Sequence, residues 1–154
     1  IGLDGFHFDP VTKDLTTPLP IQIQALELQL DLAVRYQRPV SLHCVRAIGP
    51  LMDTIAKIQK LHQGKLPPSM YFHAFGGKAA TVTQLVKTLE KNKKHASTRV
   101  YFGFAPVINF DSPKTLQVIQ QVGLDRLVLE TDHEDAALVA PSMVEGVKVI
   151  AQAL

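Results

Sequence analysis

Two histidines and one aspartate stand at the ends of short apolar runs, and their residue types suit metal chemistry. His43 ends Pro-Val-Ser-Leu-His, His73 ends Ser-Met-Tyr-Phe-His, and Asp132 ends Leu-Val-Leu-Glu-Thr-Asp. Imidazole nitrogens and carboxylate oxygens bind divalent ions, and three such ligands leave coordination positions for water. Water bound in this way becomes hydroxide near neutral pH and attacks phosphorus or carbonyl carbon. The sequence therefore predicts a hydrolytic metal site made of His43, His73 and Asp132.

The runs that carry these residues have the composition of buried strands. Extended apolar segments recur near residues 1–4, 39–43, 69–73, 99–104 and 126–131. Their spacing of roughly thirty residues is the length of one βα unit. The carboxyl ends of parallel strands in an α/β barrel line one face, so ligands at three strand ends would converge there.

Apolar residues at helical spacing fill the intervals between the predicted strands. Pro39 ends the first predicted helix, and Pro141-Ser142 opens the last. The positions predicted to be buried are Ile21, Ala25, Leu28, Leu32 and Ala33 in the first helix, Leu51, Ile55, Ile58 and Leu61 in the second, Val82, Leu85, Val86 and Leu89 in the third, which spans 79–92, Leu116, Ile119 and Val122 in the fourth, and Val144, Val147 and Ile150 in the last.

This alternation of strands and helices predicts an α/β fold with parallel strands. Five βα units are fewer than the eight that close a (β/α)8 barrel, so the alternatives are an open doubly wound sheet and an incomplete barrel. The doubly wound fold would normally carry a Gly-rich phosphate loop after an early strand, and neither G-x-G-x-x-G nor a Walker pattern is present. We therefore favour an incomplete TIM barrel.

Composition sets looser bounds on function. The chain has 154 residues, of which 46% are hydrophobic and 19% charged, enough for a buried core in one domain. A net charge of +2 neither supports nor excludes a nucleic-acid substrate. The single cysteine, Cys44, fits a reducing compartment and predicts a cytoplasmic or nuclear location. We expect no membrane association, because no apolar stretch approaches the length of a membrane span.

Several other residues that could do chemistry receive structural interpretations. Cys44 follows His43 and, by strand alternation, is expected to pack in the core. His7 and Asp9 lie in a predicted loop before Pro10, so we leave them out of the site. His62 and His95 are assigned to solvent-exposed helix ends, as are Lys91, Lys93 and Lys94. Glu130, two residues before Asp132, is expected to point inward and to support the metal ligands.

Five motifs in order resemble the TatD family of metal-dependent deoxyribonucleases, which are amidohydrolase-like barrels. The motifs are Ile1-Gly2-Leu3-Asp4, which resembles the end of G-E-I-G-L-D; Gln22 with Gln29-Leu30-Asp31-Leu32-Ala33, which resembles Q-x7-Q-L-x-L-A; Pro39-Val40 to His43, which resembles P-V-x-x-H; His73-Ala74-Phe75-Gly76-Gly77, which resembles H-C-F-S/T-G; and Leu129-Glu130-Thr131-Asp132, which resembles L-x-E-T-D. The resemblance extends over nearly the whole chain.

The resemblance implies that His43, His73 and Asp132 bind one or two divalent ions, Mg, Mn or Zn, at a site that hydrolyses phosphodiesters. It also implies that residues 1–154 form a single barrel domain of the metal-dependent hydrolase type. The N-terminal strands of that barrel, with an H-x-H pair and a glutamate ligand, would lie before Ile1. The C-terminal end of the barrel would lie after Leu154.

Three positions depart from the family pattern. The family arginine two residues after the first histidine is Val45, and Arg46 follows it as a candidate phosphate contact. Gly76 replaces a small hydroxyl residue, and His133-Glu134 replaces Ala-Pro. These differences predict a divergent, fungal-type branch of the family.

The first functional hypothesis is a TatD-like deoxyribonuclease in which Asp132 also positions or deprotonates the attacking water, with DNA as substrate. A rival enzyme is an amidohydrolase acting on a small amide or ester. A rival outside catalysis is an interaction protein that keeps the barrel and binds a protein partner. The oligomeric state is left open.

Overall fold

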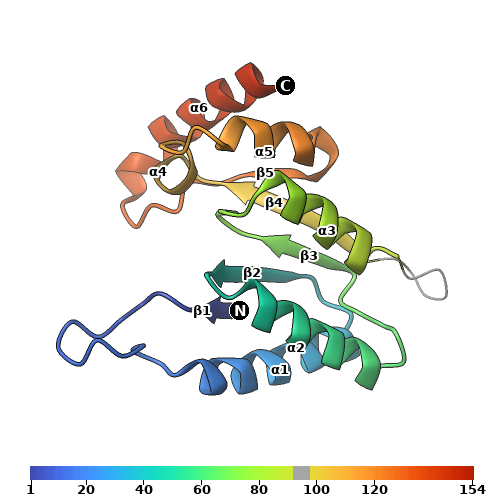
Figure 1. Ribbon diagram of the computed structural model, residues 1–154. Helices are drawn as coiled ribbons and strands as arrows, with labels where there is room; N and C mark the ends of the chain where they lie inside the picture. Colours follow the sequence, from blue (N-terminus) through green and yellow to red (C-terminus); the bar gives the residue numbers. More distant parts are fainter. Residues whose placement is uncertain (92–97) are drawn as a thin grey trace. The chain divides into compact units, whose positions relative to one another are not determined.

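A computed structural model describes residues 1–91 and 98–154, and strands alternate with helices along the chain (Figure 1). The predicted alternation is confirmed. The elements are β1 (Gly2–Asp4), α1 (Leu19–Arg35), β2 (Val40–Val45), α2 (Ile48–Leu61), β3 (Ser69–Phe72), α3 (Ala79–Leu89), β4 (Arg99–Phe104), α4 (Pro106–Asn109), α5 (Thr115–Val122), a 3-10 turn (Leu124–Arg126), β5 (Leu127–Leu129) and α6 (Ala136–Ala153).

The described residues form two compact units. Unit 1 contains residues 1–71 together with 98 and 99, and unit 2 contains residues 72–91 and 100–154. Unit 1 therefore holds β1, β2, α1 and α2, and unit 2 holds α3 to α6 with β5 and nearly all of β4. The boundary falls inside β3, whose last residue, Phe72, belongs to unit 2.

Unit 1 is a parallel strand pair covered by two helices. Gly2 of β1 is in register with His43 of β2, and Leu3 with Cys44. Figure 1 shows α1 and α2 lying side by side across these strands. The core between strands and helices is aliphatic, and its most buried members include Leu3, Leu26, Leu30, Leu42, Leu51 and Ile55. Burial of such side chains provides the main stabilisation of this layer.

Unit 2 is also built on a parallel pair, β4 with β5. Its core contains a cluster of three buried rings. The Phe102 ring stacks on Phe72 with centroids 5.7 Å apart, and Phe75 meets Phe102 edge to face at 4.9 Å. Helix α6 approaches β5 closely, because a Cβ on the buried Gly146 would lie 2.6 Å from Leu129 Cδ1. A larger residue at this position would require the end of the Leu129 side chain to move.

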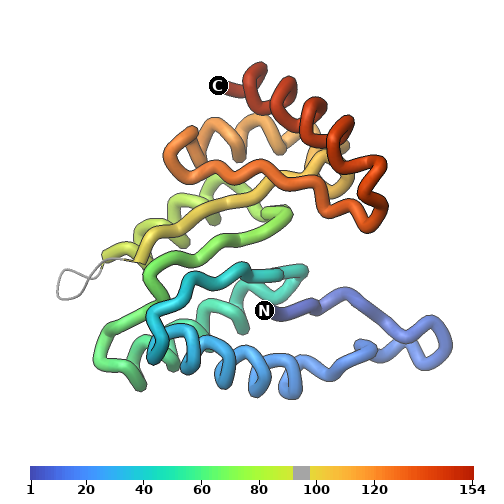
Figure 2. The backbone as a smooth tube through the Cα atoms, turned by 180° about the vertical axis from the view of Figure 1, so that it is seen from behind, coloured from blue at the N-terminus to red at the C-terminus, as the bar shows by residue number. Residues whose placement is uncertain are grey.

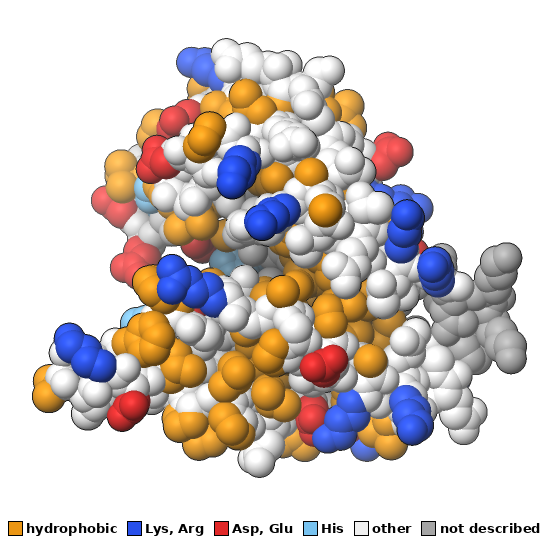
Figure 3. All heavy atoms as spheres, in the orientation of Figure 1, with side chains coloured by type: hydrophobic (Ala, Val, Ile, Leu, Met, Phe, Trp, Pro, Cys, Tyr) orange, Lys and Arg blue, Asp and Glu red, His pale blue; other side chains and the backbone are white. Residues whose placement is uncertain are grey.

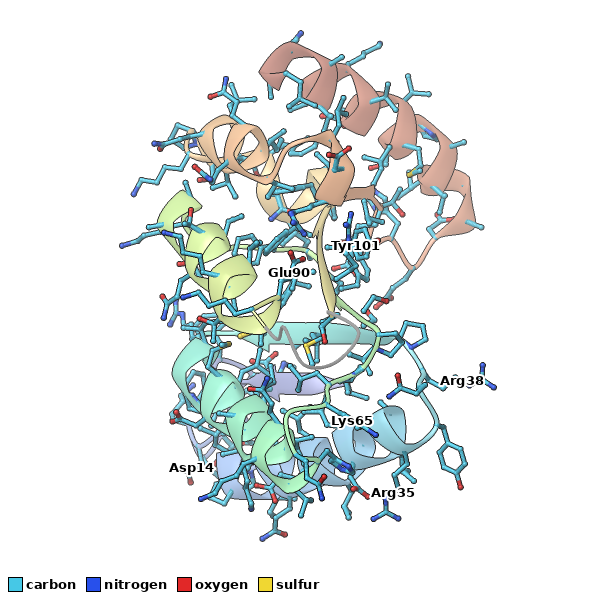
Figure 4. All side chains as sticks on the ribbon, turned by 90° about the vertical axis from the view of Figure 1, so that its right-hand side faces the viewer. Asp14, Arg35, Arg38, Lys65, Glu90 and Tyr101 are labelled. Carbon is cyan, nitrogen blue, oxygen red and sulfur yellow. The ribbon has the colours of Figure 1, made fainter. Side chains whose placement is uncertain are left out.

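An ion pair joins the end of α3 to the turn before β5. The Arg126 guanidinium donates to both carboxylate oxygens of Glu90, and Glu90 also accepts the Val100 N–H at 2.9 Å. Figure 4 shows Glu90 among the side chains gathered between α3 and β4. Both groups are largely buried, so their mutual hydrogen bonds offset the cost of removing two charges from water.

The predicted buried face of the first helix is wrong except at Ala33, and Ala25 is exposed. The face of α1 toward the strands carries Leu26, Leu30, Ala33 and Val34, whereas Ile21, Leu28 and Leu32 are about half exposed or more. Figure 3 shows apolar side chains gathered on the face over α1 and α2. The helix has two apolar stripes, and periodicity alone does not say which one meets the strands.

The later helices need similar corrections. Leu61 of α2 is 66% exposed and Leu116 of α5 is 44% exposed, although both were predicted to be buried. Helix α6 begins at Ala136 rather than at Pro141, because Asp135 caps it by accepting the Ala137 N–H. Val144 and Val147 of α6 are exposed, and only Ile150 of its three predicted core positions is buried. The sequence did not predict the short helix α4.

Helix α6 also bears on the expectation that the chain has no membrane segment. Its 18 residues have a mean hydropathy of 1.2, and 22% of the segment is buried. By length and composition alone, this helix is long and apolar enough to cross a bilayer. One such helix is weak evidence for a membrane span, because core helices of soluble proteins share these properties.

The Gln22 side chain fixes α1 to β1, and its removal should destabilise the protein. Gln22 Oε1 accepts the Asp4 N–H at 2.7 Å, while Nε2 donates to the carbonyls of Asp4 at 2.9 Å and Thr17 at 2.8 Å. We expect Gln22→Ala in the full-length protein to lower the free energy of unfolding by about 2 kcal/mol. Urea denaturation measures this loss. Gln24→Ala, at an exposed position of the same helix, should change it by less than about 0.5 kcal/mol, and an equal loss there would contradict the prediction.

Candidate metal centre

Three of the residues singled out by sequence lie together in unit 2. His73 Nδ1 is 3.5 Å from Glu130 Oε2 and 3.9 Å from Asp132 Oδ1. His73 directly follows β3, and the two acids follow β5. The side chains are 23%, 19% and 39% exposed, respectively, so this cluster is open to small molecules from solvent. Strand ends therefore place one imidazole beside two carboxylates.

Glu130 holds the backbone next to His73. Its Oε1 accepts the Ala74 N–H, while its Oε2 is the oxygen nearest the imidazole. Ala74 has a φ of 43° and Asp132 a φ of 57°, both in the left-handed region that only glycine adopts without cost. Non-glycine residues in this region are concentrated at functional sites, where the surrounding structure holds them.

Asn109 supports the same turn from α4. Its side-chain oxygen accepts the Ala105 N–H at 2.8 Å, and its Nδ2 donates to the Phe75 carbonyl at 3.1 Å. The Phe75 N–H in turn donates to the Gly103 carbonyl at 2.9 Å. The turn that carries His73 is thus tied to β4 and α4 through buried polar groups, which should limit its movement.

The third predicted ligand, His43, lies in unit 1 beside an acid. His43 Nε2 is 3.2 Å from Asp4 Oδ2, and Asp4 Oδ1 accepts the N–H groups of Phe6 at 2.8 Å and His7 at 3.0 Å. Burial alone would raise the pKa of Asp4, but these hydrogen bonds outweigh it and hold the pKa below its ordinary value. Asp4 therefore stays ionised at neutral pH, with one oxygen toward the imidazole.

Arg46, the candidate phosphate contact, stands just past β2. It is exposed, has a φ of 50°, and places its guanidinium carbon 3.8 Å from the centroid of the Phe6 ring. This is a cation–π contact, which also fixes the direction of the side chain.

The two pairs formed by His73 with Glu130 and with Asp132 suit a divalent metal by donor type and spacing. Two ligand atoms that are each about 2.1 Å from one ion lie about 3–4 Å apart, and the separations of His73 from Glu130 and Asp132 fall in this range. Mixed nitrogen and oxygen donors suit Zn, Mn and related ions. Within residues 1–91 and 98–154, however, no group of three or more His, Cys, Asp or Glu side chains is arranged to hold an ion. The structure thus brings ligand-type residues together in pairs, Asp4 with His43 and His73 with each acid.

Residues kept out of the predicted site have other contacts. His62 Nε2 lies 2.8 Å from Asp31 Oδ1, so its partner is an acid on α1 and not solvent alone. Cys44 is partly buried, and burial raises the pKa of its thiol. His133, from the divergent His133-Glu134 pair, lies 3.1 Å from Ser142 Oγ. Predictions for Lys93, Lys94 and His95 fall outside the described residues.

Sequence reasoning missed the roles of Asp4 and Asn109. Asp4 entered the sequence analysis only as the last residue of the motif Ile1-Gly2-Leu3-Asp4. Its position at the end of a predicted strand could have indicated a site residue. Asn109 carried no such signal, because its hydrogen bonds depend on how α4 folds back on the strand end.

The family model of the TatD related DNases matches residues 1–152. The chain belongs to the TatD-related DNase family. This match confirms the resemblance seen in the five motifs.

TatD-related proteins from three organisms are similar to the chain. Cut9-interacting protein scn1 of Schizosaccharomyces pombe is 24% identical over 155 residues, which cover 86% of the chain and 44% of scn1. The human 3'-5' RNA nuclease TATDN2 is 28% identical over 120 residues, 76% of the chain and 14% of TATDN2. The uncharacterized metal-dependent hydrolase YjjV of Escherichia coli K12 is 32% identical over 139 residues, 90% of the chain and 45% of YjjV. The chain spans less than half the length of each relative.

A solved structure of the TatD family confirms the fold class. The hydrolase TatD family protein from Entamoeba histolytica superposes with a TM-score of 0.62 at 19% identity, covering 92% of the chain and 40% of that protein. The chain is thus an α/β protein of the TIM-barrel type, and its five strands correspond to an incomplete barrel. A hydrolase fold follows from family membership, whereas the substrate does not.

Proposed function

We propose that this TatD-family hydrolase is a divalent-metal-dependent nuclease that cleaves phosphodiester bonds, with DNA as its first candidate substrate. The observation that carries the proposal is the cluster of His73, Glu130 and Asp132 at the ends of β3 and β5. The printed name of the human relative, a 3'-5' RNA nuclease, supports nuclease chemistry and makes RNA the alternative nucleic acid. The name of YjjV supports metal dependence.

In this proposal His73 and Asp132 of unit 2 would be metal ligands, and His43 of unit 1 is the third candidate ligand that the sequence predicts. A bound divalent ion would supply Lewis-acid chemistry, polarising the phosphate and lowering the pKa of water. Asp132 would accept a proton from the attacking water, whose oxygen would form a bond to phosphorus as the bond to the leaving oxygen breaks. The leaving oxygen would take up a proton from solvent. Glu130 keeps His73 in place through the Ala74 amide, and Asp4 orients His43.

Elemental analysis of the full-length protein, beside His73→Ala, tests the metal site. One or two tightly bound divalent ions per chain, with fewer in the variant, would support the proposal. Absence of bound metal after incubation with Mn²⁺ or Zn²⁺ would refute it. The wild type should then hydrolyse single-stranded DNA or RNA faster than a panel of lactones and small amides, and the reverse order would identify an amidohydrolase.

A non-catalytic interaction protein is the second candidate, favoured by the printed name of scn1 as a Cut9-interacting protein. It predicts neither bound metal nor hydrolysis, so the same measurements separate the two. For either function we propose a cytoplasmic or nuclear location, where the single Cys44 would stay reduced.

A further inference from the structure

The loop between β1 and α1 presents two aromatic rings to solvent. Phe6 is 49% exposed and Phe8 is 46% exposed, and their rings meet edge to face with centroids 5.8 Å apart. Figure 2 shows the loop projecting away from the strands of unit 1 before the chain enters α1. Adjacent exposed apolar side chains mark binding sites more often than scattered single ones do.

The loop is held in shape by its own hydrogen bonds. Besides the two N–H groups bound by Asp4, Asp9 Oδ1 accepts the N–H groups of Val11 and Thr12, both at 2.8 Å. These hydrogen bonds lower the pKa of Asp9, and the one from the Thr12 N–H has the largest effect. The Thr16 N–H donates to the His7 carbonyl at 2.9 Å, which closes the base of the loop. The rings are therefore presented on an ordered segment, which reduces the entropy cost of binding.

Arg46 places a cation on this aromatic pair. Its guanidinium carbon lies 3.8 Å from the Phe6 centroid, and Gly5 lets the loop approach, since a Cβ there would lie 3.2 Å from the carbonyl oxygens of Val45 and Arg46. The N–H groups of a guanidinium radiate in its plane, so a cation in contact with a ring can still donate to a phosphate. Figure 3 shows apolar and basic side chains side by side over this part of unit 1.

The rings are connected to the candidate metal ligand of unit 1. Asp4 binds the Phe6 amide with one oxygen and lies 3.2 Å from His43 with the other. One carboxylate therefore fixes both the loop and the imidazole. A ligand on Phe6 and Phe8 would lie beside the end of β2 and the candidate ligand His43.

We infer that Phe6, Phe8 and Arg46 form a subsite that binds a nucleotide of a single-stranded nucleic acid, with the base on the rings and the phosphate on Arg46. The inference rests on the proposed function and assigns three residues of this chain to nucleotide binding. Stacking on aromatic rings is the usual means of binding unpaired bases, which a duplex keeps inside. An apolar protein segment would fit the rings but leave Arg46 without an anion. Asp4 and Asp9 turn their carboxylates toward loop amides, which reduces their repulsion of phosphate.

Binding of fluorescein-labelled oligo-dT and oligo-U, measured by anisotropy in the full-length protein with EDTA, tests the inference without turnover. We expect Phe8→Leu to weaken binding about 10-fold, while Phe8→Trp keeps wild-type affinity, because tryptophan stacks and leucine does not. Arg46→Gln should lower the slope of log affinity against log salt by about 0.7, the value for one phosphate on a single strand. Val11→Ala, at a position 86% exposed in the same loop, should bind as wild type.

Equal affinity of Phe8→Leu and wild type for both oligonucleotides would overturn the inference and leave the rings to a protein partner. An equal loss in Val11→Ala would also overturn it, since the effect would then come from loop disorder. If wild type contains metal and hydrolyses oligonucleotides while the ring variants bind normally, the subsite fails and the proposed function stands. If wild type neither binds nor hydrolyses them, both fail. Preference for oligo-dT or oligo-U identifies the natural strand.

Discussion

Asp132→Asn should lower kcat/KM for oligonucleotide hydrolysis by about 100- to 10,000-fold, while the protein stays folded. The carboxylate lies 3.9 Å from His73 and is the proposed ligand and proton acceptor. Asparagine has nearly the same shape and tolerates the left-handed φ of 57° found at this position, so the backbone should keep its conformation. The amide has much weaker affinity for a metal and cannot accept the proton as a carboxylate does. Hydrolysis assays with metal analysis and circular dichroism on the same preparation measure the three effects.

The matched control for this variant is Asp125→Asn. Asp125 is an exposed acid before β5 in the same unit, so the variant has the same change in net charge without touching the cluster. It should hydrolyse oligonucleotides at the wild-type rate. Unchanged turnover in Asp132→Asn would refute the role of Asp132, and equal losses in both variants would assign the effect to charge.

Phe102→Ala should lower the free energy of unfolding by about 3–5 kcal/mol. The Phe102 ring is fully buried and contacts two further rings, Phe72 at 5.7 Å and Phe75 at 4.9 Å, so its removal leaves a cavity that they cannot fill. Because Phe72 directly precedes His73, the loss should also loosen the candidate metal ligand. Urea or thermal denaturation of the full-length protein measures the change.

Leu124→Ala provides the comparison for a lost apolar side chain at the surface of the same unit. Leu124 is 71% exposed, so its truncation should change stability by less than about 0.5 kcal/mol. Phe102→Leu should recover part of the stability, because it refills some of the cavity. A loss below 1 kcal/mol in Phe102→Ala would contradict the packing described for unit 2.

The strand ends were predictable from sequence because short apolar runs and the polar residues after them mark where a buried strand stops. His73 and Asp132 follow such runs, and the structure places them beside one another. The phase of the helices was harder to predict. In α1, Leu26 and Leu30 form one apolar stripe and Leu28 and Leu32 another, and only packing against β1 decides between them.

Local chemistry also hid one helix boundary and one side-chain role. Proline favours the first turn of a helix, so Pro141 suggested a start, yet the Asp135 cap begins α6 five residues earlier. The role of Asp4 depends on a loop that folds back so that backbone amides meet its carboxylate. Such side-chain geometry has no periodicity in the sequence, so pattern analysis cannot predict it.

The left-handed turn after β3 also lowers the stability of the folded protein. A left-handed alanine costs on the order of 1 kcal/mol that a glycine would not, and Ala74 holds a φ of 43° beside the candidate ligand His73. We expect Ala74→Gly to raise the Tm by a few degrees, although greater chain freedom at the turn should make His73 less well positioned. A substitution that stabilises this turn would therefore act on the residue next to the candidate ligand, and calorimetry with metal analysis would measure both effects.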